Sequence, residues 1–195
     1  MVQKVLHTFR VGIWFVRARV QFFLRGVRWP PNLTVLGPLG LSAGGSLELG
    51  ENILIINDTK YNRAGVCHPT QLVAAAGATL KIGSNVGISG ASIYATKSIS
   101  IGDHVLIGVN CHIYDSDFHP LDWMDRRKSI NVQRAAVTIE DDVWLCANVT
   151  VLKGVTIGAR SVIAAGSVVT SDIPSDVVAA GIPAKVVKRL NPESE

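Results

Sequence analysis

The side chains best suited to chemistry gather in one polar stretch, YDSDFHPLDWMDRRKSINVQRAAVT, which begins at residue 114. It holds His119 directly before Pro120, with Asp115 and Asp117 a few positions earlier. Histidine ionises near neutrality, so it can take the proton of an attacking hydroxyl. Proline restricts the preceding residue to extended backbone, which gives the His119 ring a fixed projection. His119 is therefore the candidate general base, the alternative being a loop histidine that only packs.

Other residues of this stretch are candidates for supporting roles. Asp115 or Asp117 could fix the tautomer of the imidazole or contact an acceptor, although loop aspartates more often cap turns. The triplet Arg126, Arg127 and Lys128 is either a charged loop tip or a contact for an anionic group of a substrate, such as a phosphate.

The elements that must position this stretch follow a six-residue period. Aliphatic residues occupy every sixth position from residue 139, and smaller residues stand four positions after each. The series is Ile139, Leu145, Val151, Ile157, Ile163 and Val169; upstream it recurs as Ile82, Ile88 and the aromatic Tyr94 and, after one inserted residue, as Ile101, Ile107 and Ile113. A period of six matches neither a helix at 3.6 nor a strand at 2, so it predicts short strands joined by turns. Three such strands per coil would form an all-β prism with an aliphatic interior.

The period also predicts the boundaries. Ile113 and Ile139 are 26 positions apart, eight more than one coil of 18, so residues at about 114–137 are expected to leave the prism as a loop. Spacing is irregular between residues 33 and 81. Glycines 50, 83, 102, 108 and 158 are expected to serve tight turns. We divide the chain into an arm (1–30), a repeat body (31–180) and a C-terminal segment (181–195).

Charge separates the arm from the body. The net charge is +4, yet the first acidic residue is Glu48, so residues 1–30 carry +6 and the remainder sums to −2. A slightly acidic body disfavours nucleic acid as a partner.

The arm has helical periodicity in its apolar residues, Phe9, Ile13, Val16, Val20, Phe23, Leu24 and Val27. Interrupting arginines argue against a spanning segment or a signal peptide. Such an amphipathic helix either docks on its own domain or a neighbouring subunit, or lies on a membrane surface through residues 4–28.

Cysteine usage bears on the compartment. Three widely spaced cysteines, Cys67, Cys111 and Cys146, form neither a disulfide framework nor a zinc pattern. We therefore expect a cytoplasmic protein, with the arm allowing a peripheral position on the inner face of the cell membrane.

Residues 80 to 188 resemble the hexapeptide-repeat acyltransferases, most of all the sugar O-acetyltransferases of the galactoside, maltose and cell-surface polysaccharide type. The resemblance implies a left-handed parallel β-helix, acetyl coenzyme A as co-substrate, no metal, and a homotrimer with sites in grooves between subunits. Members of the family have an equivalent histidine-proline pair on this loop, which implies the general-base role for His119. The acceptor would be a hydroxyl of a sugar or of a polysaccharide intermediate.

The same resemblance assigns donor contacts. In the run DDVWLCANVTVLKGVTIGARSVIAAGSVVTSDIP, Trp144 would lie beside the thiol end of coenzyme A, and Ala147 and Ala165 would offer backbone groups to its pantetheine arm. Thr170 matches a family threonine, whereas Ser171 stands where lysine is common. Lys185 and Lys188, in VVAAGIPAKVVKRL, match positions that meet the phosphates, the alternative being a solvated charge cluster that includes Arg189. Cys146 stands in a glycine position and is expected to be a turn residue, not a nucleophile.

Two rivals remain. A non-catalytic scaffold at a membrane surface would need neither His119 nor Trp144. A metalloenzyme resembling the γ-class carbonic anhydrases would need three convergent histidines, and His68, His104 and His112 are available, although the last two occupy different repeat positions. For the acceptor, Ser89 is a weak candidate, because the sequence SGA there lacks the asparagines expected for galactoside-like recognition.

Overall fold

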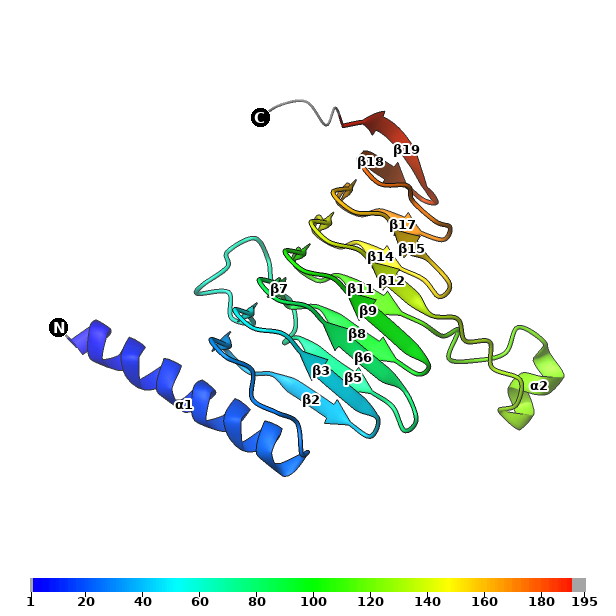
Figure 1. Cartoon of the computed structure of the whole chain (residues 1–195). Helices are drawn as coiled ribbons and strands as arrows, with labels where there is room; N and C mark the ends of the chain where they lie inside the picture. The colour runs from blue at the N-terminus through cyan, green and yellow to red at the C-terminus, as the bar shows by residue number, and fades with distance from the viewer. Residues whose placement is uncertain (1, 191–195) are drawn as a thin grey trace.

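The computed structural model describes residues 2–190, with side chains from Gly12 onwards. The chain winds into a prism with three faces of parallel strands (Figure 1). We call the faces sheets A, B and C, in the order in which each coil visits them. Sheet A contains β1 (Thr34–Leu36), β4 (Leu54–Ile56), β7 (Gly87–Ser89), β10 (Leu106–Ile107), β13 (Trp144–Leu145), β16 (Val162–Ile163), β18 (Val177–Gly181) and an antiparallel β19 (Ala184–Arg189). Sheet B contains β2 (Gly40–Ala43), β5 (Gln71–Ala74), β8 (Ser92–Ala95), β11 (His112–Tyr114), β14 (Thr150–Val151) and β17 (Val168–Val169). Sheet C contains β3 (Ser46–Leu49), β6 (Thr79–Ile82), β9 (Ser98–Ile101), β12 (Val137–Ile139) and β15 (Thr156–Ile157).

The prism interior is built by the repeat. On sheet A, Ile88 pairs in register with Ile107, which pairs with Leu145 and then Ile163, and all four are buried. Each coil therefore adds one aliphatic layer per face to a continuous core. This confirms the predicted all-β parallel β-helix with its N-terminal helix.

The register of β8 differs from the prediction at Tyr94. Ile93, not Tyr94, pairs with Ile113 and is fully buried, while Tyr94 points outward and is half-exposed. The repeat shortens to five residues between Ile88 and Ile93. Because neighbouring residues of a strand face opposite sides, this single-residue change moves the aromatic ring from the core to the surface of sheet B.

The turn glycines serve a different purpose from the one predicted. A Cβ at Gly50 would lie 2.6 Å from the carbonyl carbon of Gly83, and one at Gly83 would lie 2.6 Å from that of Gly102. These glycines thus allow stacked coils to approach closely, and their own φ angles are not left-handed. The left-handed residue of each turn comes two positions later, as at Asn52 (φ 57°) and Asn85 (φ 60°).

Two segments leave the prism, on opposite sides (Figure 1). The first excursion, residues 115–136, joins β11 to β12 and contains α2 (Trp123–Lys128), as the spacing predicts. The second excursion, residues 57–70, joins β4 to β5 and lies in the region of irregular spacing. Its base is closed by Asn57, whose Oδ1 accepts hydrogen bonds from the Thr70 N–H (2.8 Å) and hydroxyl (2.6 Å), and whose Nδ2 donates to the Pro38 carbonyl (2.6 Å).

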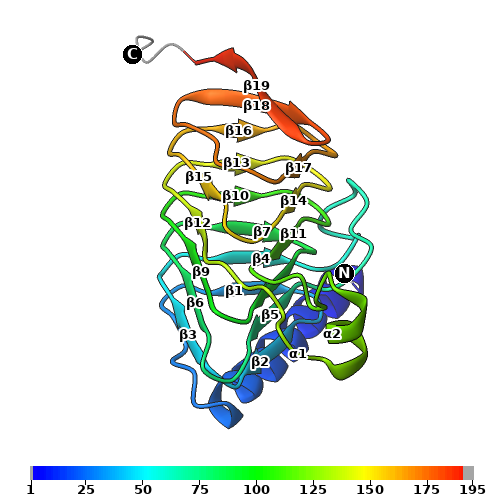
Figure 2. The same cartoon turned by 90° about the vertical axis from the view of Figure 1, so that its right-hand side faces the viewer.

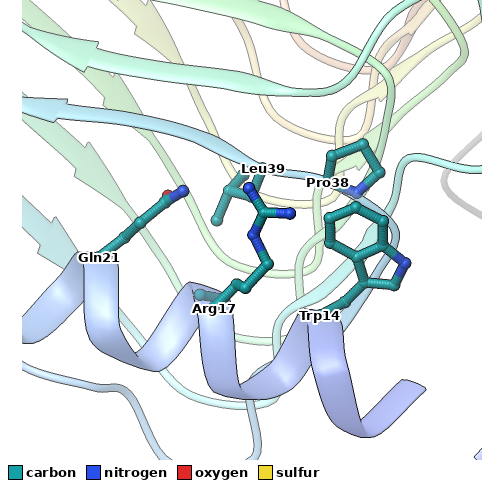
Figure 3. A pocket seen from close by; sticks show the side chains of 6 residues that line it. Trp14, Arg17, Gln21, Pro38 and Leu39 are labelled. Carbon is teal, nitrogen blue, oxygen red and sulfur yellow. The ribbon is translucent and has the colours of Figure 1, made fainter. Parts of the chain in front are cut away.

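The arm forms α1 (Val2–Leu24), which packs against β1 across the N-terminal end of the prism (Figures 1 and 2). Ala18 and Phe22 are buried, and the Phe22 ring meets Trp29 edge to face at 5.1 Å. Figure 3 shows Trp14 and Arg17 of this docked side facing Pro38. Docking on its own domain is thus observed. Among the described residues, no helix combines the length and apolarity needed to cross a bilayer.

The docked face of α1 is not the predicted apolar stripe. Val16, Val20 and Phe23 are exposed, whereas Ala18 and Phe22 pack on β1 and Trp29. Because the side chain of Ala18 is small, the helix can approach β1 closely on this face. The side chains of Lys4, Phe9 and Arg10 lie outside the described residues.

Candidate active site

Asp115 anchors the first excursion where it leaves β11. The side chain is fully buried, and its two carboxylate oxygens accept four hydrogen bonds. Oδ1 accepts from the Thr96 N–H (2.7 Å) and hydroxyl (2.8 Å), and Oδ2 accepts from the N–H groups of Lys97 and Ser98 (both 2.7 Å). The oxygens are thus occupied by the turn of the coil below. This geometry gives no support to the expected acceptor contact of Asp115, whose role here is to fix the loop.

Asp117 and His119 follow on this fixed base. The Asp117 carboxylate forms an ion pair with Lys153 of the next coil (Nζ to Oδ1, 2.8 Å), while its Oδ2 is buried without a protein partner among the described residues. The Asp117 carbonyl accepts a hydrogen bond from the His119 N–H at 2.7 Å. His119 is exposed at the corner between sheets B and C. Asp117 therefore holds the backbone that presents His119.

Phe118, between these two residues, adopts a left-handed conformation (φ 60°). Bulky residues rarely adopt this conformation, and such strain persists only where surrounding contacts impose it. Those contacts are the rings of Tyr94 (5.3 Å between centroids) and Tyr114 (5.2 Å), both edge to face. Tyr94, which the repeat pattern assigned to the core, thus helps to fix the residue next to the candidate base.

The tip of the first excursion is α2. Asp122 caps its N-terminus by accepting from the N–H groups of Met124 and Asp125 (both 2.9 Å). The Arg126 guanidinium donates to the Pro120 and Leu121 carbonyls (3.2 and 3.3 Å), and that of Arg127 lies 4.7 Å from the Trp123 ring centroid. Two members of the basic triplet therefore have structural partners within the loop.

Trp144, the expected donor contact, lies on strand β13 of sheet A. It is half-exposed on the outer face, in register with Leu106 below and Val162 above. The same column continues through Val178 to Lys188 on β19. Three strand spacings of about 4.8 Å make it roughly 14 Å from Trp144 to Lys188. On this face, Val162 and Val178 thus form an apolar strip between the exposed ring of Trp144 and the side chain of Lys188.

The other expected donor residues divide between two corners. Ala147 and Ala165 occupy stacked turns between sheets A and B, where the Ala147 carbonyl accepts from the Gly166 N–H (2.9 Å). Thr170 is exposed at the corner between sheets B and C, on the side of the first excursion. Lys185 is exposed on β19. Within one chain, Trp144, Ala147 and Ala165 therefore lie at one edge of sheet B, and His119 and Thr170 at the other.

Two cysteines near the corner between sheets A and B, Cys111 and Cys146, are poorly suited to nucleophilic chemistry. Burial raises the pKa of the Cys111 thiol to about 11, and burial also raises the pKa of Cys146 above its ordinary value. Both thiols are therefore protonated at neutral pH. All three cysteines of the chain are unpaired.

A row of aromatic rings crosses the outer face of sheet B and was not predicted. It runs from Phe118 through Tyr114, His112 and His68, with centroid separations of 5.2, 5.8 and 5.7 Å. It borders a cleft of about 350 Å³ lined by Gln71, Val73, Ser92, Ile93, Tyr94, Tyr114 and Phe118. The signal for it is present in the sequence as aromatic residues directly after Ile93 and Ile113. A strict six-residue period conceals this signal, because it places Tyr94 in the core.

Two asparagines that are distant from Ser89 in the sequence, Asn62 and Asn110, lie near it in the folded chain. Asn62 of the second excursion donates from Nδ2 to the Ser89 hydroxyl (3.1 Å). Asn110, one coil above, accepts from the Cys67 N–H (2.9 Å) and donates to the Gly65 carbonyl (2.8 Å). These contacts hold the second excursion over the corner between sheets A and B, directly below the turn that contains residue 147.

The three histidines that a metalloenzyme resembling the γ-class carbonic anhydrases would need, His68, His104 and His112, do not all lie together. His68 and His112 are adjacent, and burial together with the His68 charge lowers the pKa of His112. His104 instead lies in the turn between β9 and β10, where its Nε2 is 3.4 Å from Asn85 Nδ2. Within the described part of the chain, no three metal-ligating side chains form a group.

Comparisons with family models match the repeat body. Residues 136–171 match the bacterial transferase hexapeptide (six repeats), and residues 98–113 match the hexapeptide repeat of succinyl-transferase. Both segments consist of the six-residue period described above.

Several proteins similar to this chain are acetyltransferases. The chain is 40% identical over 117 residues to the galactoside O-acetyltransferase of Escherichia coli, covering 56% of each protein, so it spans about half the length of that relative. A hexapeptide-repeat acetyltransferase of Vibrio cholerae, solved with acetyl coenzyme A, is 32% identical with a TM-score of 0.51, over 84% of this chain and 70% of that one. A maltose O-acetyltransferase of Clostridium difficile is 30% identical with a TM-score of 0.50, over 78% and 70%.

Proposed function

Because the chain belongs to the hexapeptide-repeat acetyltransferase family, we propose that it transfers an acetyl group from acetyl coenzyme A to a hydroxyl of a sugar or of a cell-surface polysaccharide intermediate. One observation carries this proposal. An exposed imidazole, His119, stands on a loop that the buried Asp115 carboxylate ties to the prism through four hydrogen bonds. A rigidly presented base is what direct acyl transfer requires.

His119 performs the proton transfers of this reaction. As the acceptor oxygen bonds to the thioester carbonyl carbon, the hydroxyl proton passes to the imidazole. The tetrahedral adduct then collapses, the carbon–sulfur bond breaks, and the imidazolium returns the proton to the departing sulfur. The products are an ester and the free thiol of coenzyme A. No side chain of the protein is acylated, consistent with the protonated thiols of Cys111 and Cys146.

The donor would lie along sheet A. Trp144 offers an exposed apolar surface for its thiol end, and Lys185 and Lys188 offer cations for its phosphates. Ala147 and Ala165 present turns with small side chains, which allow a pantetheine arm to approach the backbone at the edge between sheets A and B. Thr170 lies across sheet B, so any contact it makes to the donor would come from another subunit.

A homotrimer would complete this site. Within one chain sheet B separates His119 from Trp144, and a threefold arrangement with sheet B facing the axis brings the corner between sheets B and C of one subunit to the corner between sheets A and B of the next. His119 of one subunit would then face the donor of its neighbour. The exposed aromatic surface of sheet B suits burial in such an assembly.

The acceptor would approach from the first excursion. The Asp117 Oδ2 atom is buried and has no protein partner among the described residues, so it is able to accept a further hydrogen bond two residues before His119. In the trimer, Ser89 and Asn62 of the neighbouring subunit would lie opposite, because they occupy the corner between sheets A and B. Hydroxyl and amide groups of this kind are suited to the hydroxyls of a sugar.

Titration calorimetry with acetyl coenzyme A tests the donor assignment. Saturable binding is expected, and Trp144→Ala should weaken it about thirtyfold, because removing an apolar contact of this size costs about 2 kcal/mol. Lys188→Gln should weaken binding of acetyl coenzyme A more than that of acetyl pantetheine, which lacks the nucleotide phosphates. Leu54→Ala, on the same face below Trp144, and Lys81→Gln on sheet C serve as controls. Absence of saturable binding would instead favour a non-catalytic scaffold.

A screen of acceptors with thiol release as the readout tests the reaction itself. Sugars and polysaccharide intermediates with free hydroxyls should stimulate thiol release above the slow hydrolysis of acetyl coenzyme A. Amino sugars with every hydroxyl blocked should not. Stimulation by the amino compounds alone would contradict O-transfer.

A further inference from the structure

The side of α1 that faces away from the prism is apolar. With 100° between successive residues, Val16 and Val20 each lie about 160° from Ala18, the centre of the docked face. We call the exposed residues on this side the outward stripe. They are Ile13 (42% exposed), Val16 (58%), Val20 (48%), Phe23 (83%) and Leu24 (71%). A contiguous apolar strip with this exposure marks an interaction surface, because isolated apolar residues do not align along one side of a helix by chance.

Arginines border the outward stripe on both sides. The backbone positions of Arg17 and Arg19 lie about 100° from Ala18 in opposite directions, so one borders each edge of the stripe. The Arg17 side chain reaches toward Pro38 (Figure 3), and the Arg19 guanidinium lies 5.6 Å from the Trp29 ring centroid. The arm itself contains no acidic residue. Asp58 of the second excursion lines a cavity together with Arg17, yet the two side chains form no ion pair, and the ion pairs among the described residues involve other parts of the chain. The surface around the stripe therefore carries a net positive charge.

We propose that the outward stripe docks on an anionic lipid bilayer, with α1 lying parallel to the membrane plane. The apolar side chains would enter the boundary between headgroups and acyl chains, and the positive charge of the bordering arginines would attract the lipid phosphates. Charge argues against a second copy of α1 as the occupant, since its own arginines would face those of the first. A deformable bilayer also accepts the convex helix with Phe23 protruding, whereas a protein partner would need a matching groove.

The position of α1 sets the orientation of the whole chain. Because α1 covers the N-terminal end of the prism, the bilayer would lie below that end and β19 would point away from it (Figure 1). The strand β11, from which the first excursion leaves, is three coils above β2, or roughly 14 Å at about 4.8 Å per coil. The helix diameter adds about 10 Å. His119 would therefore reach hydroxyls well above the headgroups, as on the distal sugars of a lipid-linked chain.

This acceptor assignment rests on the proposed acetyl transfer, whereas the docking itself does not. In the proposed trimer the three prisms would run parallel, so all three α1 helices would lie at the same end. Simultaneous contact through three helices would strengthen attachment well beyond the affinity of one.

Vesicle flotation of the full-length protein tests the docking. The protein should float with phosphatidylcholine vesicles that contain phosphatidylglycerol, less with phosphatidylcholine alone, and less again at high salt. Phe23→Glu should lower the partition coefficient more than tenfold, since it places a charge at the most exposed point of the stripe. Arg19→Gln should lower it about fivefold on anionic vesicles only. Leu121→Glu, which adds the same charge at an equally exposed residue (81%) of the first excursion, should leave partitioning unchanged.

Several results would overturn the proposal. They are no flotation with anionic vesicles, equal flotation with neutral ones, or unchanged partitioning of Phe23→Glu. If sedimentation velocity showed that Phe23→Glu reduces the oligomer while lipid binding persists, the occupant would be a second copy of the chain. Acetyl transfer to a free sugar, measured in parallel, separates the two proposals: a wild-type protein that transfers acetyl groups but does not float with anionic vesicles would contradict the docking alone.

Discussion

Replacing His119 with alanine is expected to lower kcat for acetyl transfer by about 10²- to 10⁴-fold, the usual contribution of a positioned general base. The dissociation constant for acetyl coenzyme A should change little, because the proposed donor contacts are made by Trp144, Lys185 and Lys188, whereas the imidazole is proposed to bind the acceptor hydroxyl. The fold should also persist, since His119 is exposed and its hydrogen bond to the Asp117 carbonyl is donated by the backbone N–H. Steady-state kinetics, calorimetry and urea unfolding measure the three quantities.

A histidine elsewhere provides the matched control. His104 is exposed in a turn with a left-handed backbone (φ 57°), a conformation that asparagine tolerates. His104→Asn should therefore keep the wild-type kcat. A wild-type rate in His119→Ala would rule out the proposed proton transfer, and an equal loss in both variants would point to a general effect of removing a histidine.

Asp115→Ala is expected to be the most destabilising single change in the first excursion. It would leave three backbone N–H groups and the Thr96 hydroxyl without their acceptor in a buried position, at about 1–3 kcal/mol for each unsatisfied donor that water cannot reach. We expect a loss of about 3–5 kcal/mol in the free energy of unfolding. Because His119 stands only four residues further along, kcat should fall as well.

Asp115→Asn separates shape from charge, and Asp122→Ala serves as the control. The side-chain amide introduced by Asp115→Asn would have one oxygen for the four donors, so an intermediate loss of stability is expected. Removing the Asp122 cap of α2 should cost only about 1 kcal/mol. Urea unfolding with kcat measured on the folded fraction gives both values. If Asp115→Ala and Asp122→Ala had equal free energies of unfolding, water would be replacing the lost carboxylate oxygens, and Asp115 would contribute little to holding the first excursion.

Local repetition explains why much of the fold was predictable. Ile139, Leu145 and Val151 recur at a fixed period because every strand and corner of the prism repeats the same backbone geometry. An interruption of that period predicts an insertion, which is how the first excursion and His119 can be found. The second excursion interrupts the period in the same way, between Ile55 and Leu72. It escapes prediction because too few regular repeats flank it to establish the spacing.

What the sequence by itself determined was therefore the repeating architecture, the loop that carries His119 and the residue types available for chemistry. Tertiary structure alone decided which face of α1 docks, that Asp115 is buried, and that His119 and Trp144 lie at opposite edges of sheet B. The physical reason is the range of the interactions. A repeat in the sequence reflects contacts that every coil makes in the same way, so it can be found from residue spacing. The hydrogen bonds from Thr96 to Asp115 and from Asn110 to Gly65 are each made once, between residues that come together only when the coils stack.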